Sequence, residues 1–367
     1  MKRSSLLRLG AAPFAAALLP RRAFAASARS VRDLAPVAVA LDSVTRTTVG
    51  LRPYRRGGFV VRAEAAGAKT VVHHYGHGGG GMSLSWGTAL QARAMALATE
   101  KRSAAVIGCG VIGLSTARVL QDAGFTVRIY ARDVPPETTS NVSGAQWTPS
   151  SLYVADAVDA AYMARFAEAS ELAQRRFQTL LGDDYGVRWI ENYDCYDTPG
   201  RGFFNLTVPA VNRHLYPEFV EYAPGQHPFP TRYASKFLTM IIEPNRYLRA
   251  LVRDFFARGG TLQAGALASG DVARLPEPLV FNCAGLGARE LFGDAELEPV
   301  RGQLSILAPQ PRADYIVLSP AGYVFPRSDG VVLGGTFEHG NAGTVPDPAT
   351  ERRILAGHQR FFAAMRS

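Results

Sequence analysis

The feature that most constrains this chain is a glycine-rich turn between a short apolar segment and a helical pattern. Residues 104–107 form an apolar run of strand length, and Gly108, Gly110 and Gly113 follow it as G-x-G-x-x-G. The next residues, LSTARVLQDAG, continue at helical spacing to a glycine, and TVRIY follows as a second strand pattern. This strand–turn–helix–strand context predicts an α/β fold with a Rossmann-type domain that binds a dinucleotide.

Each part of this fingerprint (residues 108–113) has a physical role. The first glycine makes the tight turn, the second lets a pyrophosphate approach the backbone, and the third lets helix and strand pack closely. The positive end of the helix dipole then faces the phosphates. The alternative is a tight strand–helix turn that binds nothing. The expected cofactor contacts are Gly108, Gly110, Val111, Ile112 and Gly113.

The loop after the second strand indicates which dinucleotide binds. The strand ends in Ala131-Arg132-Asp133, and Arg132 at this point is compatible with the 2′-phosphate of NADP. The following second loop (residues 135–151, PPETTSNVSGAQWTPSS) gathers hydroxyls, an amide, a glycine and a tryptophan. A nicotinamide domain has no need of such a loop, whereas the larger FAD does. FAD is therefore predicted, with contacts from Ala131, Arg132, Thr138, Thr139, Ser140, Gly144, Ala145, Gln146 and Trp147.

Longer segments resemble one family. AVIGCGVIGLSTARVLQDAGFTVRIYARDVPPETTSNVSGAQWTP is similar to the N-terminal part of the D-amino-acid oxidases, FAD enzymes that share a fold with glycine and sarcosine oxidases. LVFNCAGLGARELFGD resembles a later FAD-contacting strand and turn of that family, and VRGQLSIL and GYVFPRSDGVVLGGTFEHGN resemble its substrate-domain strands. VVHHYGHGGGGMSLSWGTALQA resembles the family signature. The resemblance spans most of residues 45–345 and implies further FAD contacts at Gly285, Gly78, Gly79, Gly80, Gly81, Met82 and Ser83.

The order of these segments is unusual for the family. The arginine segment (residues 49–64, VGLRPYRRGGFVVRAE) and the glycine signature (residues 71–92) normally close the chain, whereas here they precede the fingerprint. The chain ends in a helical pattern that would normally lead into the arginine segment. Because chain ends often lie close together, such a circular permutation is physically tolerated. We expect an FAD-binding domain from residues 66–150 and 235–290, interleaved with a mixed-sheet substrate domain from residues 40–65, 151–234 and 291–367.

The resemblance implies a reaction and a substrate site. Oxidation of an α-amino acid transfers a hydride from Cα to the flavin. Arg52 would hold the substrate carboxylate through its planar fork, Tyr323 would meet the same carboxylate, and the carbonyl of Gly79 would accept from the amine. Ser319 stands where relatives often have a second tyrosine, which leaves the shape of the lid open.

The predicted function is oxidative deamination of D-amino acids to 2-oxo acids and ammonia, with molecular oxygen reduced to hydrogen peroxide. The alternatives are a glycine- or sarcosine-type amine oxidase, an amino-acid dehydrogenase with another electron acceptor, and a flavin-binding protein without turnover. A small-molecule substrate is expected, and a homo-oligomer is left open.

Several nearby residues have competing interpretations. His73 and His74 are adjacent on a strand and point to opposite faces, so they are expected to be structural rather than metal ligands, while His77 would line the flavin. Met240 and Ile241 are expected to face the pocket. Arg327 either selects an acidic substrate side chain or is a solvated loop residue.

The first 25 residues have the pattern of an export signal. A basic start is followed by an apolar run that is too short to span a bilayer and by a small-residue cleavage site. Lys2-Arg3 makes a loose twin-arginine motif, and an uncleaved amphipathic start is the alternative. Removal of this segment takes away five basic residues and no acidic one, which lowers the formal net charge from +9 to +4. Such a mildly basic chain gives no case for nucleic-acid binding.

The cysteine content argues against a disulfide framework. The chain has only Cys109, Cys195 and Cys283, an odd number with two members inside apolar or fingerprint contexts. None lies in the glycine signature, so noncovalent FAD is expected.

Overall fold

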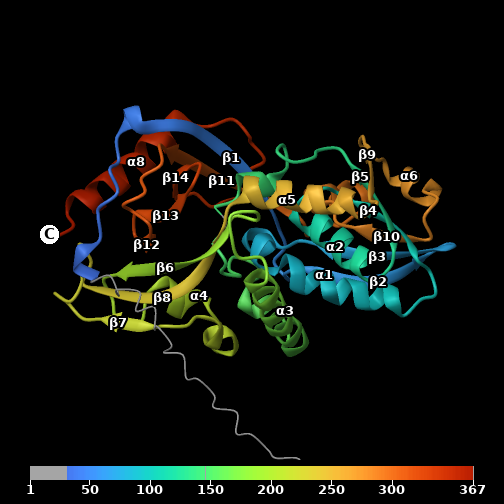
Figure 1. The fold of residues 1–367 in the computed structure, drawn as a ribbon, viewed down its shortest axis with the longest axis horizontal. Helices are drawn as coiled ribbons and strands as arrows, with labels where there is room; N and C mark the ends of the chain where they lie inside the picture. The colour runs from blue at the N-terminus through green and yellow to red at the C-terminus, as the bar shows by residue number, and fades with distance from the viewer. Residues whose placement is uncertain (1–30, 145, 367) are drawn as a thin grey trace, which may run out of the picture.

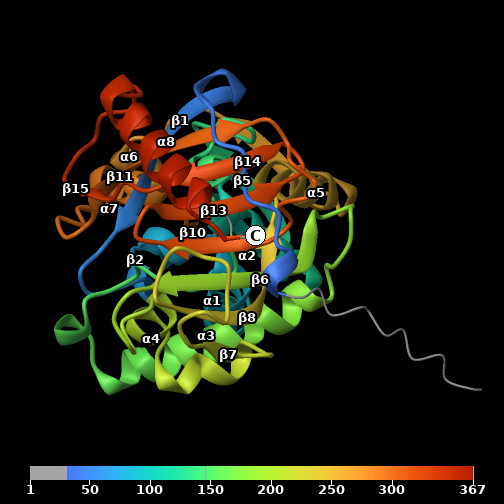
Figure 2. The same cartoon turned by 90° about the vertical axis from the view of Figure 1, so that its left-hand side faces the viewer.

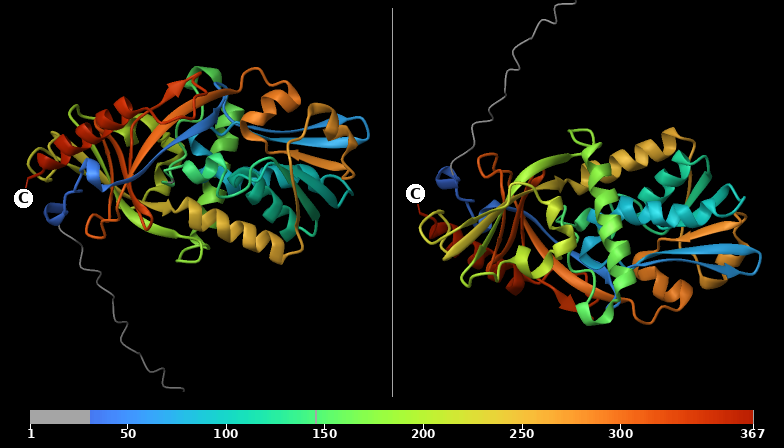
Figure 3. Two further views of the ribbon diagram at one scale, coloured as in Figure 1. Left: turned by 90° about the horizontal axis from the view of Figure 1, so that it is seen from above. Right: turned by 90° about the horizontal axis from the view of Figure 1, so that it is seen from below.

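The computed structural model describes residues 31–144 and 146–366, which form two β-sheets at opposite ends of an elongated molecule (Figures 1 and 3). The six-stranded sheet has the order β2-β3-β10-β4-β5-β9. All neighbours in it are parallel except the β2–β3 hairpin. Its strands are β2 (Val60–Ala66), β3 (Lys69–Tyr75), β4 (Ser103–Ile107), β5 (Thr126–Ala131), β9 (Thr261–Ala264) and β10 (Leu279–Asn282).

Helices cover both faces of this sheet. The side chains of Ala104 and Val106 pack into a core with helices α1 (Gly81–Leu97), α2 (Val111–Asp122) and α5 (Pro244–Ala257). Ala105 and Ile107, which point to the opposite face, pack with α6 (Ser269–Arg274) and α7 (Ala288–Phe292). Burial on both faces explains why β4 is an uninterrupted apolar run rather than an alternating one.

The nine-stranded sheet is mixed and has the order β1-β11-β14-β13-β12-β6-β8-β7, with β15 paired to β11. Helix α8 (Pro348–Ala363) lies across its outer face (Figure 2), while α3 (Ala160–Gln178) packs on α1 and α4 (Phe203–Thr207) follows β6. Its strands are β1 (Val44–Tyr54), β6 (Val187–Tyr196), β7 (Val220–Tyr222), β8 (Tyr233–Ile242), β11 (Glu298–Leu307), β12 (Ile316–Ser319), β13 (Gly322–Arg327), β14 (Gly330–Gly334) and β15 (Glu338–His339).

The α/β fold class predicted from the sequence is confirmed, with two mixed sheets. At two places the strands lie in the other sheet from the one expected. Strand β2 belongs to the six-stranded sheet because a turn at Gly67-Ala68 folds it directly onto β3. Strand β8 belongs to the nine-stranded sheet because it pairs along its whole length with β6 before entering α5. The sheets therefore divide the chain differently from the predicted domain boundaries at residues 65 and 235.

The two ends of the described chain lie near each other. Leu34 and Val37 share a core with Ile354 and Phe361 of α8, and the Tyr315 hydroxyl donates to the carbonyl of Ala35 at 2.6 Å. The beginning of the coloured chain and the C-terminus accordingly lie at the same end of the molecule (Figures 1 and 2). The expected export signal falls outside the described residues. Within residues 31–144 and 146–366, no helix has the length and apolar character needed to cross a bilayer.

Candidate active site

A cavity of about 1240 Å³ lies between the two sheets. The fingerprint, the glycine signature and the second loop form one part of its wall, and strands of the nine-stranded sheet form the other. This volume exceeds the range of about 300–1,000 Å³ that is usual for small-ligand pockets. The cavity is therefore large enough for a dinucleotide together with a second, smaller ligand.

The fingerprint turn leaves no room for a side chain at Gly108 or Gly113. Gly108 has φ +108°, and a Cβ on it would lie 2.5 Å from the carbonyl oxygen of Cys283. A Cβ on Gly113 would lie 2.0 Å from the carbonyl oxygen of Gly108, so this glycine sets how closely α2 packs on the turn. The N-terminus of α2 faces the cavity, as a pyrophosphate site requires. These features fit the predicted dinucleotide.

The second loop is fixed by its own hydrogen bonds. The Ser140 Oγ accepts from the Val111 N–H at 3.0 Å, which joins the loop to the start of α2. Thr138 donates to Asn141 at 2.7 Å, and Gln146 donates to Asn192 at 2.9 Å. Arg132 is exposed at the fingerprint end of the cavity and forms an ion pair with Asp133 at 2.8 Å.

Most of the predicted cofactor residues line this cavity, but four lie behind its wall: Gly80, Ser83, Gly113 and Trp147. Trp147 is fully buried, and its backbone N–H donates to the carbonyl of Met240 at 2.7 Å. Ser83 donates to the carbonyl of Gln146 at 3.3 Å and accepts from the N–H of Thr148 at 3.1 Å. These two residues position the loop. Ala145 lies outside the described residues.

The glycine signature packs tightly against the end of the second loop. Gly78 has φ +48°, and a Cβ there would lie 2.4 Å from the carbonyl oxygen of Ser151. The N–H of Gly79 donates to that carbonyl at 3.0 Å. A Cβ on Gly80 would collide with Leu152 at 2.8 Å. Gly78, Gly79, Gly81 and Met82 line the cavity, whereas Gly80 is required for packing beneath it.

The three histidines near this signature have separate partners. His73 lies 2.9 Å from Glu64, His74 hydrogen bonds with Thr116 at 2.8 Å, and His77 hydrogen bonds with Thr88 at 3.1 Å. Burial lowers the pKa of His77 to about 3, so this ring is neutral where it lines the cavity. In the part of the chain that the structure describes, no group of three His, Cys, Asp or Glu side chains is placed to hold a metal ion.

Arg52 lines the cavity and is only partly buried. Its guanidinium rests over Gly302 of the neighbouring strand, where a Cβ would be 2.4 Å from Nη1. Its Cζ lies 4.9 Å from the centroid of the Phe337 ring, and Nη1 donates to the carbonyl of Thr336 at 3.4 Å. Among the described residues, no carboxylate forms an ion pair with Arg52. It is therefore a cation held in place by neutral groups.

Tyr323 lies beside this guanidinium. Its ring covers Gly334, where a Cβ would be 1.9 Å from a ring carbon, and it stacks on Phe325 with centroids 4.7 Å apart. Burial raises the pKa of the Tyr323 phenol, and a hydrogen bond from Arg52 lowers it. The structure places Arg52 and Tyr323, both predicted from the sequence, side by side in the cavity. The sequence did not indicate Gly302 and Gly334, which make the space in which the two side chains meet. Only the sheet register shows what these glycines face.

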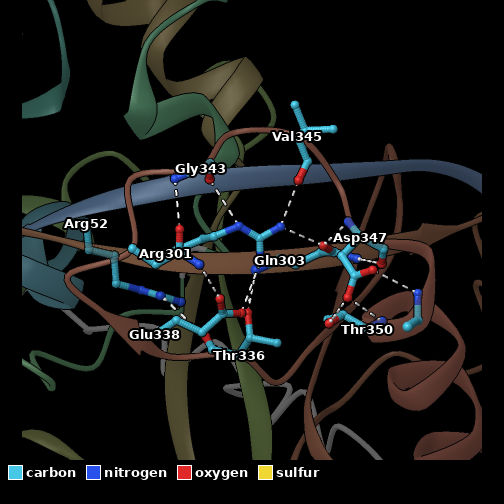
Figure 4. Close-up of polar contacts among 11 residues, drawn as sticks. Arg52, Arg301, Gln303, Thr336, Glu338, Gly343, Val345, Asp347 and Thr350 are labelled. Carbon is cyan, nitrogen blue, oxygen red and sulfur yellow. Dashed lines mark hydrogen bonds and ion pairs between the residues drawn. The ribbon is translucent and has the colours of Figure 1, made fainter.

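Arg301 and Arg327 are both buried and both donate to acceptors of the protein. Arg301 donates to Glu338 at 3.0 Å, to Gln303 at 3.0 Å and to the carbonyls of residues 343 and 345 (Figure 4). Arg327 pairs with Asp329 at 2.7 Å and donates to the carbonyl of Ser143 at 3.0 Å. Arg327 is 6% exposed and does not line the cavity, so neither selection of an acidic substrate side chain nor a solvated loop position fits it.

Met240 and Ile241 do not face the pocket either. Both are fully buried. Met240 belongs to the hydrophobic core between the six-stranded sheet and its helices, and Ile241 belongs to a smaller hydrophobic cluster of the nine-stranded sheet. A residue that sequence reasoning missed does face it: Asp194, near the end of β6, is 2% exposed and lines the cavity. Its sequence context, ENYDCYDT, gives no local signal, because its neighbours come from distant strands.

The chain is similar to known flavoenzymes. A family model described as FAD dependent oxidoreductase matches residues 103–367. A D-amino-acid oxidase from Rubrobacter xylanophilus is 36% identical over 260 residues, which cover 69% of this chain and 74% of that protein. A D-amino-acid oxidase from Streptomyces coelicolor is 31% identical over 258 residues, which cover 68% and 74%.

Solved structures with the same fold include an iminodiacetate oxidase from Chelativorans sp. BNC1, with a TM-score of 0.54 and 15% identity over 71% of this chain and 79% of that one. An L-proline dehydrogenase from P. horikoshii gives 0.54 and 16% identity over 72% and 78%. At these identities the likeness establishes the fold alone. Together with the extent of the family match and the glycine-lined cavity, it shows that this chain belongs to the FAD-dependent oxidoreductase family that includes the D-amino-acid oxidases, with FAD as its cofactor.

Proposed function

We propose that this protein oxidatively deaminates D-amino acids to 2-oxo acids and ammonia, with molecular oxygen as the electron acceptor. The observation that carries this proposal is Arg52, a cation without a carboxylate partner among the described residues, next to Tyr323 in the cavity that contains the fingerprint. The two D-amino-acid oxidases at 36% and 31% identity support it. One amino acid, one oxygen and one water give one 2-oxo acid, one ammonia and one hydrogen peroxide.

Three residues that line the cavity, Arg52, Tyr323 and Gly79, would bind and orient the substrate. Arg52 would hold the α-carboxylate through two parallel hydrogen bonds, and the Tyr323 hydroxyl would donate a third. The carbonyl of Gly79, which also lines the cavity, would accept from the amine. FAD, when bound, supplies the acceptor for the hydride of Cα. The protein's contribution is to fix Cα in a near-attack position, an effect that reaches about 7–11 kcal/mol in well-oriented systems.

Two related activities compete with this proposal. A glycine- or sarcosine-type amine oxidase would act on substrates without a side chain, and a dehydrogenase would pass electrons to a carrier other than oxygen. The cavity continues past Arg52 and Tyr323 to side chains of β6 and α4, which gives a substrate side chain room and favours amino acids larger than glycine.

Anaerobic bleaching of the flavin tests the proposal. The FAD-loaded protein is mixed with D-amino acids, their L-enantiomers, glycine and sarcosine, and air is then admitted. D-amino acids should bleach the yellow colour, and air should restore it with release of peroxide. Bleaching by L-amino acids or sarcosine alone would overturn the proposal. Bleaching that air does not reverse would assign a dehydrogenase.

FAD is proposed to bind noncovalently. Cys109 and Cys283 line the cavity, but burial raises the pKa of each thiol to about 12, which leaves no thiolate to attack the flavin. Acid precipitation should therefore release the colour into the supernatant.

We also propose that the protein is exported with removal of its first residues, on the basis of the basic, apolar and small-residue pattern of residues 1–25. N-terminal sequencing of protein from its native cell should start near Ala26. An intact Met1 in a soluble cytoplasmic fraction would contradict this.

A further inference from the structure

Asp194 is a buried carboxylate at the wall of the cavity. Its side chain is 2% exposed, and its Oδ2 accepts from the N–H of Phe204 at 2.9 Å, near the start of α4. Burial raises the pKa of Asp194 to about 6, and the backbone N–H bonds of Phe204 and Phe203 lower it. Among the described residues, no Lys, Arg or His forms an ion pair with this carboxylate.

The hydrogen bond to α4 does not require a charge. Asn, Ser or Thr would supply an acceptor for the Phe204 N–H equally well. A desolvated carboxylate without a cation costs folding free energy, and such costs concentrate at functional sites. The negative charge of Asp194 is therefore a feature that packing of the protein alone does not explain.

The sheet register places Asp194 in the same row as the substrate-binding residues. Asp194 pairs with Leu318, Leu318 pairs with Tyr323, and Tyr323 pairs with Gly334. Paired residues of neighbouring strands share a face of the sheet. Asp194 thus lies on the cavity face, two strands from Tyr323, which corresponds to roughly 10 Å.

We propose that Asp194 is an anionic subsite for the far end of the substrate side chain, so that the site selects D-amino acids with a cationic side chain such as D-lysine and D-arginine. The inference rests on the function proposed above and specifies its substrate class. Arg52 would hold the α-carboxylate at one end, and the four-carbon stem of lysine would carry the ammonium toward Asp194. The two charges of the site then complement the two ends of one ligand.

Other charged groups near this end of the cavity are less able to select. Asp197 and Arg201 also line it, but both are exposed, and Asp197 accepts from the N–H of Arg232 at 3.0 Å. Water and salt screen such charges over about 8–10 Å. Asp197 therefore provides a matched control, since it is an acid of the same cavity end and the same strand–loop segment, but it is solvated.

The test compares D-lysine with D-norleucine, which has the same four-carbon stem without the ammonium, on three FAD-loaded proteins: the parent, Asp194→Asn and Asp197→Asn. The parent should prefer D-lysine. Asp194→Asn keeps the acceptor for α4 and removes the charge, so kcat/KM for D-lysine should fall about 30-fold or more, mainly through KM. The value for D-norleucine should stay within about threefold, and Asp197→Asn should change neither substrate by more than that.

A binding measurement supplies a readout that does not depend on turnover. Perturbation of the flavin absorbance should give a tighter Kd for 6-aminohexanoate than for hexanoate, and Asp194→Asn should remove the difference. Equal loss for D-lysine and D-norleucine in Asp194→Asn would assign Asp194 a structural role and overturn the inference, as would a parent that prefers D-norleucine. If no D-amino acid bleaches the flavin, the proposed function fails and this inference fails with it. If neutral D-amino acids bleach it and the charge has no effect, only the subsite fails.

Discussion

The two ends of the cavity use glycine for different purposes. At the fingerprint end, Gly108, Gly110 and Gly113 come from six consecutive residues and clear space for a cofactor and for backbone. At the substrate end, Gly302 and Gly334 come from two different strands, β11 and β14, and clear space for the protein's own side chains, those of Arg52 and Tyr323. A local sequence pattern can encode the first arrangement, whereas the second exists only after the sheet has formed. The two ends should therefore fail in different ways when they are altered.

The largest expected effect concerns the substrate end. Arg52→Ala should leave folding and FAD binding nearly unchanged, because no described carboxylate loses a partner. Removal of one member of a largely desolvated, two-point charged contact costs roughly 2–5 kcal/mol, so kcat/KM for D-amino acids should fall by about two to four decades. Steady-state kinetics at fixed FAD measure this, and Arg52→Lys should recover only part of the loss. A decrease of less than about threefold, under 1 kcal/mol, would show that Arg52 does not hold the carboxylate.

At the fingerprint end, Gly113→Ala should damage the fold and the cofactor site together. The added methyl would lie 2.0 Å from the carbonyl oxygen of Gly108, and backbone cannot move aside as a side chain can. We expect a loss of stability of about 3 kcal/mol and weaker FAD retention on gel filtration. Normal FAD content and an unchanged Tm would show that α2 can shift without cost.

Ionisation of Asp194 should lower the free energy of unfolding above pH 6. Its pKa is raised from 3.8 to about 6, so the folded state binds this proton more tightly than the unfolded state does. Ionisation in the folded protein therefore costs stability above pH 6, and the cost disappears as the pH falls toward 4.

Asp194→Asn should consequently raise the free energy of unfolding by about 2 kcal/mol at pH 8 and by almost nothing near pH 4. Denaturant titrations at saturating FAD measure the difference. A variant that is less stable than the parent at pH 8 would mean that the carboxylate has a cationic partner in the folded protein.

Gly302→Ala is the counterpart of Gly113→Ala at the substrate end. Its methyl would meet the flexible end of Arg52 rather than backbone, with Nη1 at 2.4 Å. The fold and the FAD content should survive, while the displaced guanidinium should lower kcat/KM about tenfold. If both glycine variants lose FAD to the same extent, the distinction between the two ends is wrong.

The smallest effect is expected from restoring the usual family order, since neither end of the cavity is touched. We propose that the chain is circularly permuted. The family match that begins at residue 103 and the shared core of residues 34–37 with α8 support this. A chain opened between α1 and β4, with residues 366 and 31 joined by a glycine–serine linker, should bind FAD with stability within about 1 kcal/mol of the parent. An insoluble or colourless product would argue against the permutation.

The elements that were predicted correctly from the sequence are those that local patterns determine. The strand–turn–helix of β4 and α2 and the C-terminal helix α8 follow from periodicity and glycine stops. The role of Trp147 was misjudged because a polar loop predicts ligand contact, whereas its partner Met240 lies in β8, far along the chain. Asp194 and Gly302 were missed for the same reason, since Leu318 and Arg52, which they face, lie more than a hundred residues away. Gly334 pairs with Tyr323 only eleven residues away, but the two residues meet only once β13 and β14 have paired.

The second loop also has a mechanical consequence. Residues 146–148 are bonded at once to Ser83 of α1, to Met240 of β8 and to Asn192 of β6. A hinge motion that separated the two sheets would break these buried bonds, each of which is worth about 1 kcal/mol. These bonds oppose separation of the two sheets, so we expect amino acids to enter and leave near the exposed cavity residues Asp197 and Arg201 rather than by domain opening. Exchange of substrate and product would then depend on local movement around Asp197 and Arg201. The distance between the cofactor site and Arg52 would stay constant through each turnover.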